Sequence, residues 1–271
     1  MPSANAPRPS GEARDRSVLD AARISVGLRR CGHEVDVRCH DVVDSTQDVA
    51  RETVRQGAVG PVLVVAQRQT GGRGRRGRRW VHTPGGLAFT LAVQLPPDAP
   101  AAWPTMAAAL GAVRAIEAHA GVALGIKWPN DLVHGERKVG GVLAEARGPW
   151  SLVGVGLNVN AAPGIVDGTP TASLAEAAGG ELDLAALLVE LAAAIMDALL
   201  ADAATRRAAQ RPWNERSVVL GERVFVSGPD GHVYGRVEAL PADGSLHLAL
   251  DDGTRRVITT GDVSLRLDRN A

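Results

Sequence analysis

Gly72-Arg-Gly-Arg-Arg-Gly-Arg-Arg-Trp80 is the stretch around which the chain is organised. Five arginines and two glycines fill the positions from Arg73 to Arg79, and no Asp or Glu occurs between Thr53 and Pro97. Glycine adopts backbone angles that other residues avoid, and arginine offers a planar fork that matches phosphate or carboxylate. Because glycine is a poor helix former and packs nothing in a strand, the stretch predicts an irregular cationic loop.

Three interpretations of this loop are open from its composition. It is a solvated charged loop, a nucleic-acid contact of the Arg/Gly-rich kind, or a phosphate clamp that orders on a nucleotide. Arg/Gly segments that bind nucleic acid are usually repeated within a basic domain. This one is single, and the whole chain has a formal net charge of +0.

Length and composition indicate a globular protein. The 271 residues, 45% of them hydrophobic, predict one medium domain and a small one. Cys31 and Cys39 form neither a disulfide framework nor a metal-ligand set, which fits a reducing compartment. No apolar run reaches the about 18 residues needed to span a bilayer, and the N-terminus lacks an apolar signal segment. We therefore expect a cytoplasmic protein with no membrane partner.

The chain ahead of the first expected strand is short. Residues 1–16 are rich in Pro, Ser and charge, and predict a disordered tail. Residues 17–30 predict one helix, with Ser17 as its cap. A helix-turn-helix DNA-binding domain needs two or three helices, so we expect no DNA partner.

Residues 17–216 alternate between strand and helix patterns and predict a mixed α/β domain. Ser45, three residues before Asp48, resembles a capping box that begins a helix to about Gln56. Further helix patterns cover 103–120, 184–200 and 204–216, and 161–180 is expected to be loop with a short helix. The expected strands are 35–43, 61–67, 87–95, 124–128, 132–134, 138–146 and 151–159.

The pattern changes after Arg216. Residues 217–271 carry short alternating segments separated by turns rich in Gly and Asp. The expected strands here are 223–227, 232–239, 245–250, 255–259 and 263–267. Short strands at this spacing predict a small β-barrel, closed to hide its edges.

Lys127-Trp-Pro-Asn-Asp131 places an ammonium, an amide and a carboxylate at the end of one strand, although an ordinary Pro-Asn-Asp turn has the same composition. Of 30 basic residues, only Lys127 and Lys138 are lysines. A lysine kept where arginine is otherwise used points to a compact ammonium that a guanidinium cannot replace. Lys138 precedes Gly140 and Gly141, and paired glycines in a strand predict close approach by a ligand.

Two further motifs follow, Arg137-Lys-Val-Gly-Gly-Val-Leu-Ala-Glu145 and Gly154-Val-Gly-Leu-Asn158. In their order and spacing, these motifs together resemble those of the biotin–protein ligases. The resemblance covers residues 35–271 and implies a mixed-sheet catalytic domain over 17–216, followed by an SH3-like β-barrel over 217–271. It implies that biotin and ATP give biotinyl-5′-AMP and pyrophosphate. The biotinyl group would then pass to one lysine of a biotin carboxyl carrier domain. Without a DNA-binding domain, we expect a monofunctional ligase.

The resemblance also implies roles for individual residues. The biotin-binding residues it implies are Ser45, Thr46, Gln47, Gln69, Arg73, Gly74, Arg75, Lys138, Gly141 and Gly156. The ATP-binding residues it implies are Arg75, Arg78, Trp80, Asn130, Asp131, Lys138 and Asn158. Lys138, Arg75 and Asp131 would take part in the chemistry, with Asp131 also facing Mg²⁺. The family usually has Asn where this chain has Gln47.

Two alternatives share parts of this pattern. A lipoate–protein ligase has the same fold and reaction class, and the Arg/Gly loop favours biotin over it. An RNA-binding protein that uses the loop predicts salt-dependent RNA affinity and no ATP turnover. The proposed chemistry fits the residues, because an ionised biotin carboxylate needs no general base. It needs neutralisation of the charge on the α-phosphate and on the leaving pyrophosphate, which Arg, Lys and Mg²⁺ supply.

Overall fold

The computed structural model describes residues 19–228, 231–259 and 264–267. The expected tail at 1–16 and the expected cap Ser17 lie outside the described residues. Helix α1 spans Ala21–Arg30 and is capped by Asp20, whose carboxylate accepts a hydrogen bond of 2.7 Å from the backbone N–H of Arg23. The helix therefore begins four residues later than the sequence pattern predicted.

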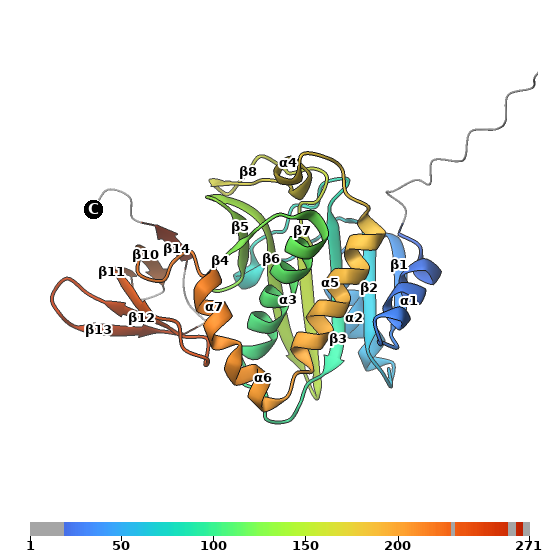
Figure 1. Cartoon of the computed structure of the whole chain (residues 1–271), viewed down its shortest axis with the longest axis horizontal. Coiled ribbons are helices and arrows are strands. Elements are labelled where there is room, and N and C mark those ends of the chain that lie inside the picture. The colour runs from blue at the N-terminus through green and yellow to red at the C-terminus, as the bar shows by residue number, and fades with distance from the viewer. Residues whose placement is uncertain (1–18, 229–230, 260–263, 268–271) are drawn as a thin grey trace, which may run out of the picture.

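A seven-stranded mixed sheet forms the centre of the larger part of the chain (Figure 1). Its strand order is β1-β2-β3-β7-β6-β5-β4. The β1–β2 pair is parallel and the other pairs are antiparallel, so the expected mixed sheet is confirmed. The strands are β1 Asp36–Val43, β2 Val62–Gln69, β3 Leu87–Gln94, β4 Gly125–Lys127, β5 Asp131–His134, β6 Arg137–Arg147 and β7 Trp150–Leu157.

Alternation along the central strands places apolar side chains on both faces of this sheet. Leu63 and Val65 of β2 join the large core beneath α3 (Trp103–Ala120) and α5 (Leu184–Leu199). Val62 and Val64 of the same strand pack instead in a smaller cluster that includes Ala50 of α2 (Thr46–Arg55). Helix α2 thus covers the face opposite α3 and α5, and its first turn lies at one end of the sheet (Figure 1).

Close packing of α3 against α5 depends on a glycine. A Cβ atom at Gly111 would lie 2.8 Å from the carbonyl oxygen of Ala194 and 2.8 Å from the Cα of Ile195. Only a residue without a side chain allows the two helix backbones to approach this closely.

The helix expected over 204–216 is two helices. Helix α6 spans Ala203–Ala208 and α7 spans Gln210–Arg216. Pro212 lies in α7 and cannot donate a backbone hydrogen bond to the preceding turn, which favours the break between α6 and α7. In the described part of the chain no single helix has the length and hydropathy of a membrane span. Helix α5 and the segment 203–216, which are bent relative to each other, reach that length and hydropathy only when taken together.

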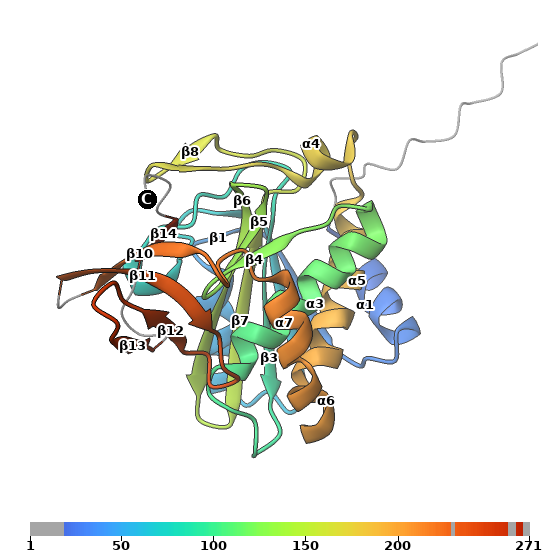
Figure 2. The ribbon, with the colours of Figure 1, turned by 60° about the vertical axis from the view of Figure 1, so that its left-hand side comes forward.

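A second, five-stranded sheet lies beside the β4 edge of the first (Figure 2). Its strands are β10 Arg223–Gly228, β11 Gly231–Ala239, β12 Leu246–Ala249, β13 Arg255–Ile258 and β14 Ser264–Leu267, in the order β13-β12-β11-β10-β14. Among the described residues this order ends at β13 and β14, so the closed barrel is not confirmed. The indole Nε1 of Trp128 donates to the carbonyl of Gly244 at 3.0 Å and joins the two sheets.

We predict that Gly111→Ala destabilises the protein by about 1–3 kcal/mol, because the added methyl group overlaps the backbone of α5. In an open helix the same change would be favourable, since alanine is the better helix former. Chemical denaturation measures the difference. Gly180→Ala is the matched control, because nothing lies within 4 Å of a Cβ at that position. Equal free energies of unfolding for the two variants would show that α3 and α5 can move apart without loss of stability.

Candidate functional site

One cavity of about 310 Å³ opens at the end of the large sheet where α2 begins. Its wall is built by the first turn of α2, the Arg/Gly loop, the 127–131 turn, and strands β6 and β7. Every residue that the sequence analysis assigned to biotin or ATP lies on this wall: Ser45, Thr46, Gln47, Gln69, Arg73, Gly74, Arg75, Arg78, Trp80, Asn130, Asp131, Lys138, Gly141, Gly156 and Asn158. The fold thus brings together four motifs that are far apart in the chain.

The cap of α2 places its first residues in the wall. The side chain of Ser45 accepts a hydrogen bond of 3.3 Å from the backbone N–H of Gln47, which satisfies one otherwise unpaired donor of the first turn. Ser45, Thr46 and Gln47 are all buried. The helix therefore presents hydroxyl and amide groups, rather than charges, to this end of the cavity.

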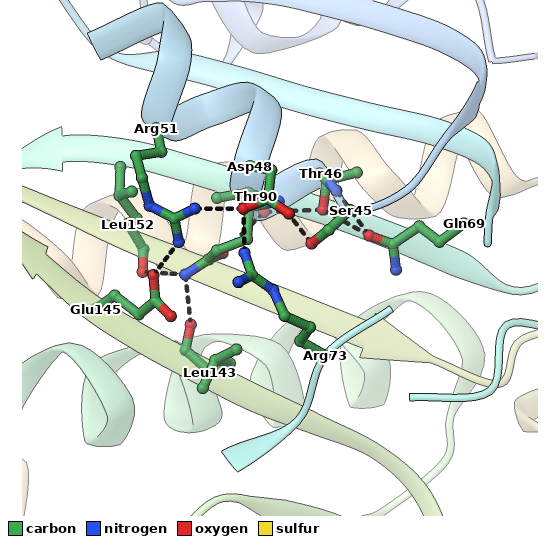
Figure 3. Close-up of polar contacts among 11 residues, drawn as sticks. Ser45, Thr46, Asp48, Arg51, Gln69, Arg73, Thr90, Leu143, Glu145 and Leu152 are labelled. Carbon is green, nitrogen blue, oxygen red and sulfur yellow. Dashed lines mark hydrogen bonds and ion pairs between the residues drawn. The ribbon is translucent and has the colours of Figure 1, made fainter. Parts of the chain in front are cut away.

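Uncharged polar groups continue across the sheet from Thr46 (Figure 3). The side-chain oxygen of Gln69 accepts from the backbone N–H of Thr46 at 2.8 Å and from the hydroxyl of Thr46 at 3.1 Å. The hydroxyl of Thr46 is also 2.9 Å from that of Thr90, a residue of β3. The sequence analysis missed Thr90, because one threonine in an apolar strand pattern gives no signal of its own.

The Arg/Gly loop is more regular than expected. The backbone N–H of Trp80 donates to Gly72 at 2.9 Å, and that of Gly74 donates to Arg78 at 2.7 Å. Between these bonds, Arg75–Gly77 forms one 3₁₀ turn in which Arg76 has a φ of 60°. The prediction of a loop without regular structure was therefore wrong over these three residues, because paired backbone bonds close the loop into a narrow hairpin.

A carboxylate of α2 anchors the start of the loop (Figure 3). Asp48 forms ion pairs with both Arg73 and Arg51. Arg51 in turn pairs with Glu145 of β6 at 2.6 Å. The chain of charges Arg73–Asp48–Arg51–Glu145 ties the loop to two elements of the scaffold. No acidic residue near the loop in sequence could have indicated this contact.

The middle of the loop concentrates positive charge. Arg75 is half-buried and lines the cavity. Burial, followed by the neighbouring guanidinium groups of Arg78 and Arg76, lowers the pKa of Arg75, and Asp131 opposes that shift. Burial and like charges both disfavour the charged form of Arg75, so an anion bound in the cavity would stabilise that charged form.

Lys138 and Asp131 form an ion pair of 2.6 Å between Nζ and Oδ1 across adjacent strands. The same ammonium lies 6.0 Å from the ring centroid of Trp80, at the limit of a cation–π contact. About a quarter of each charged side chain is exposed, 24% for Lys138 and 23% for Asp131. Lys138 is therefore a paired, mostly buried lysine rather than a solvated one.

Glycines in β6 and β7 make room for neighbouring groups in and around the cavity. A Cβ at Gly156 would lie 2.4 Å from the Trp80 ring, so this glycine makes room for that indole. A Cβ at Gly140 would lie 2.4 Å from Leu157, so Gly140 allows close packing against β7, and Gly141 rather than Gly140 lines the cavity. At Gly141 the nearest atom would be Asp131 Oδ1 at 3.4 Å, beneath the ion pair.

The two asparagines of the wall hold its backbone. The amide nitrogen of Asn130 donates to the carbonyl of Val142 at 2.8 Å, which joins the 127–131 turn to β6. The peptide bond between Trp128 and Pro129 in this turn is cis. Asn158 donates through its backbone N–H to Val139 at 2.8 Å.

A small hairpin, which the sequence analysis expected to be loop, completes the wall. It consists of β8 (Ile165–Val166) and β9 (Thr169–Pro170). Val166, Asp167 and Thr169 line the cavity. The hairpin is too short for an alternation pattern, which explains why the strands were missed. The expected short helix follows as α4 (Leu174–Ala178).

Comparison with known proteins gives consistent matches. The model of the Biotin/lipoate A/B protein ligase family matches residues 39–160, and that of the Biotin protein ligase C terminal domain matches residues 219–266. The chain is 34% identical to the biotin–[acetyl-CoA-carboxylase] ligase of Mycobacterium tuberculosis, over 82% of this chain and 87% of that protein. It is 30% identical to the bifunctional ligase/repressor BirA of Bacillus subtilis, over 91% of this chain and 79% of that protein.

Solved structures share the fold. The biotin protein ligase from Aquifex aeolicus in complex with biotin and ATP superposes with a TM-score of 0.73 at 27% identity, covering 86% of this chain and 99% of that chain.

We predict that Asp48→Asn loosens the Arg/Gly loop, because an amide cannot balance the charges of Arg73 and Arg51. Trypsin, which cleaves after arginine, should cut within residues 73–79 several times faster in the variant, as a smaller cost of opening exposes the loop more often. Glu52→Gln is the matched control, since Glu52 pairs with Arg55 on the exposed side of the same helix. Equal cleavage of both variants would mean that Asp48 does not hold the loop.

Proposed function

The chain belongs to the biotin–protein ligase family, an ATP-dependent ligase family, and from this membership we propose that it activates biotin to biotinyl-5′-AMP and transfers biotin to one lysine of a biotin carboxyl carrier domain. The observation that carries the proposal is one cavity whose wall offers two chemically different sets of groups. The uncharged polar groups come from the start of α2 and from Gln69, and the cations come from the Arg/Gly loop and Lys138. Biotin has the same division, with a ureido ring at one end and a carboxylate at the other.

The uncharged end favours biotin over lipoate. A ureido ring carries N–H and C=O groups that pair with Ser45, Thr46 and Gln69, with Gln47 behind them. The dithiolane ring of lipoate carries no such groups and would leave these buried polar atoms unpaired. A site built to hydrogen-bond its substrate rejects an analogue that lacks those groups far more strongly than an apolar pocket does.

The charged end supports the adenylation step. An oxygen of the biotin carboxylate attacks the α-phosphorus of ATP, and pyrophosphate leaves with the bonding electrons. Arg73, Arg75 and Lys138 neutralise charge on the reacting oxygens, and Arg78 and Trp80 contact the nucleotide. Gly74 and Gly141 allow the ligand to lie close to the backbone, and Gly156 makes room for the Trp80 ring beside it.

Mg²⁺ fits this site as a companion of ATP. Among the described residues no group of three or more His, Cys, Asp or Glu side chains forms a cage for a metal ion. Magnesium is usually bound by one or two carboxylates together with substrate phosphates, and Asp131 offers one such carboxylate. Bound there, the ion would neutralise phosphate charge. Asn130 and Asn158 would border the same ATP side of the cavity.

The transfer step completes the proposal. The amine of the acceptor lysine attacks the carbonyl carbon of biotinyl-5′-AMP, an amide bond forms, and AMP leaves. A free lysine has a pKa of about 10.4, so little of it is neutral near pH 7. Asp131 would orient that amine or accept its proton. Cys31 and Cys39 are free thiols, which fits the reducing cytoplasm where we place the reaction.

Pyrophosphate release tests the function directly. Purified protein with ATP and Mg²⁺ should release pyrophosphate when biotin is added, and not when lipoate replaces it. Addition of a carrier domain should then give a biotinylated lysine by mass spectrometry. Release with lipoate alone would support the lipoate ligase. RNA affinity without any release would support the RNA-binding alternative.

We predict that Lys138→Arg slows adenylation on the order of a hundredfold, by analogy with the loss of one preorganised donor. The wider planar guanidinium cannot occupy the position of the ammonium against Asp131, and small misplacements of reacting oxygens are expensive in rate. Lys127→Arg is the matched control at the other lysine and should cost less. Biotin-dependent pyrophosphate release measures both variants, and a wild-type rate for Lys138→Arg would contradict the assignment.

A further inference from the structure

The indole of Trp128 joins the 127–131 turn, which lines the cavity, to the C-terminal sheet. Trp128 is 3% exposed, and its Nε1 atom donates to a backbone carbonyl of the 241–245 turn, between β11 and β12, at 3.0 Å. We propose that Trp128 is a positioning residue, through which the 241–245 turn holds Asn130 and Asp131 in place for the nucleotide. The proposal rests on the function proposed above, which assigns those two residues to ATP.

One peptide unit determines where the acceptor of this hydrogen bond points. The carbonyl that accepts from Trp128 belongs to Gly244, and it shares a planar peptide unit with the backbone N–H of Ser245. In a trans peptide unit the C=O and N–H groups point in opposite directions. An interaction that fixes the N–H of Ser245 therefore also fixes the direction of the Gly244 carbonyl.

Asp243 provides that interaction. Its Oδ1 atom accepts from the backbone N–H of Ser245 at 2.9 Å and from the hydroxyl of the same residue at 2.6 Å. The hydroxyl, followed by the backbone N–H, lowers the pKa of the Asp243 carboxyl, which is therefore ionised at neutral pH. A further bond of 3.0 Å, from the N–H of Gly244 to the carbonyl of Pro241, closes the turn. The C-terminal sheet thus fixes by itself the direction of the carbonyl that Trp128 binds.

The 127–131 turn is held from two sides. On the side of β6, the N–H of Val142 donates to the backbone carbonyl of Asn130 at 3.0 Å, and the Asn130 amide donates to the carbonyl of Val142 at 2.8 Å. On the other side, the indole of Trp128 is bound to the C-terminal sheet. Pro129 lies between Trp128 and Asn130, and its ring restricts backbone rotation, so a displacement of the indole is carried to the asparagine.

Asp131 carries the same displacement into the charged part of the cavity. It pairs with Lys138 at 2.6 Å and is the carboxylate that the proposed function places beside the nucleotide and Mg²⁺. The residues proposed for the biotin head group belong instead to the start of α2 and to β2. A shift of the 127–131 turn therefore weakens nucleotide binding more than it weakens the binding of biotin alone.

The test is Trp128→Phe, which keeps a buried aromatic ring and removes the N–H donor. KM for ATP in biotin-dependent pyrophosphate release should rise about fivefold, as expected for the loss of one hydrogen bond. The dissociation constant for biotin alone, measured by calorimetry, should stay within about twofold of the wild-type value.

Trp103→Phe is the matched control. Trp103 is 4% exposed and donates its Nε1 proton to the carbonyl of Leu199 at 3.2 Å, but it does not line the cavity. This variant loses a buried indole hydrogen bond of the same kind, so its free energy of unfolding should fall by a similar amount. Its KM for ATP should stay at the wild-type value, which separates positioning from a general loss of stability.

A second variant reaches the same contact from the C-terminal sheet. Asp243→Ala removes the acceptor of the Ser245 N–H without changing the cavity wall, and it should raise KM for ATP by about two- to fivefold. Because Asp243→Ala and Trp128→Phe act through one hydrogen bond, the double variant should show no more than the larger single effect. Asp243 is exposed, so this variant also carries the test if Trp128→Phe does not fold.

The proposal is overturned by an unchanged KM for ATP in folded Trp128→Phe, or in Asp243→Ala where Trp128→Phe does not fold. An equal rise in Trp103→Phe, an equal loss of affinity for biotin alone, or effects that multiply in the double variant would overturn it as well. Absence of biotin-dependent pyrophosphate release in the wild-type protein would instead overturn the proposed function.

Discussion

Repulsion among the cations around the cavity is the constraint on which the site depends. Arginines of one loop gather beside Lys138, and the burial of Arg75 adds to the cost of holding them there. Two carboxylates balance part of this charge from opposite sides, Asp48 at Arg73 and Asp131 at Lys138. Each carboxylate belongs to a regular element, so the cations are held in fixed places. An anionic ligand would neutralise the positive charge that these carboxylates leave unbalanced.

The wall of the same cavity also carries uncharged polar groups. Thr46, Gln69 and Thr90 come from three different elements, yet the Thr46 hydroxyl lies 3.1 Å from Gln69 Oε1 and 2.9 Å from the Thr90 hydroxyl. The hydroxyls of Thr46 and Thr90 both take part in hydrogen bonds, and the chain ends on the backbone carbonyl of Leu152, to which Gln47 donates. A polar end that is fully satisfied is rigid, which favours recognition of one hydrogen-bonding pattern over many.

Most elements could be predicted from local patterns. The helix expected over 103–120 is α3, and the mixed sheet follows from strands with apolar runs and marked turns. The misses have physical causes. The helix pattern breaks at Ala209, between α6 and α7, three residues before Pro212, and the β8–β9 hairpin is too short to show a period. Closure of the C-terminal sheet would require its two edge strands, β13 and β14, to pair, and local alternation does not encode which strands pair.

The sequence by itself determined the loop, the two lysines and the motifs around the cavity, because each has an unusual composition that is visible within a few residues. It also determined the family, since four motifs occur in one order. Only the tertiary structure decided which side chains meet: Asp48 with Arg73, Thr90 with Gln47, and Gly140 with Leu157 rather than with a ligand. These contacts join residues 17 to 43 positions apart, and their partners have ordinary compositions. Hydrogen-bond direction and close packing act through space, so they become visible only when the sheet has set the distances.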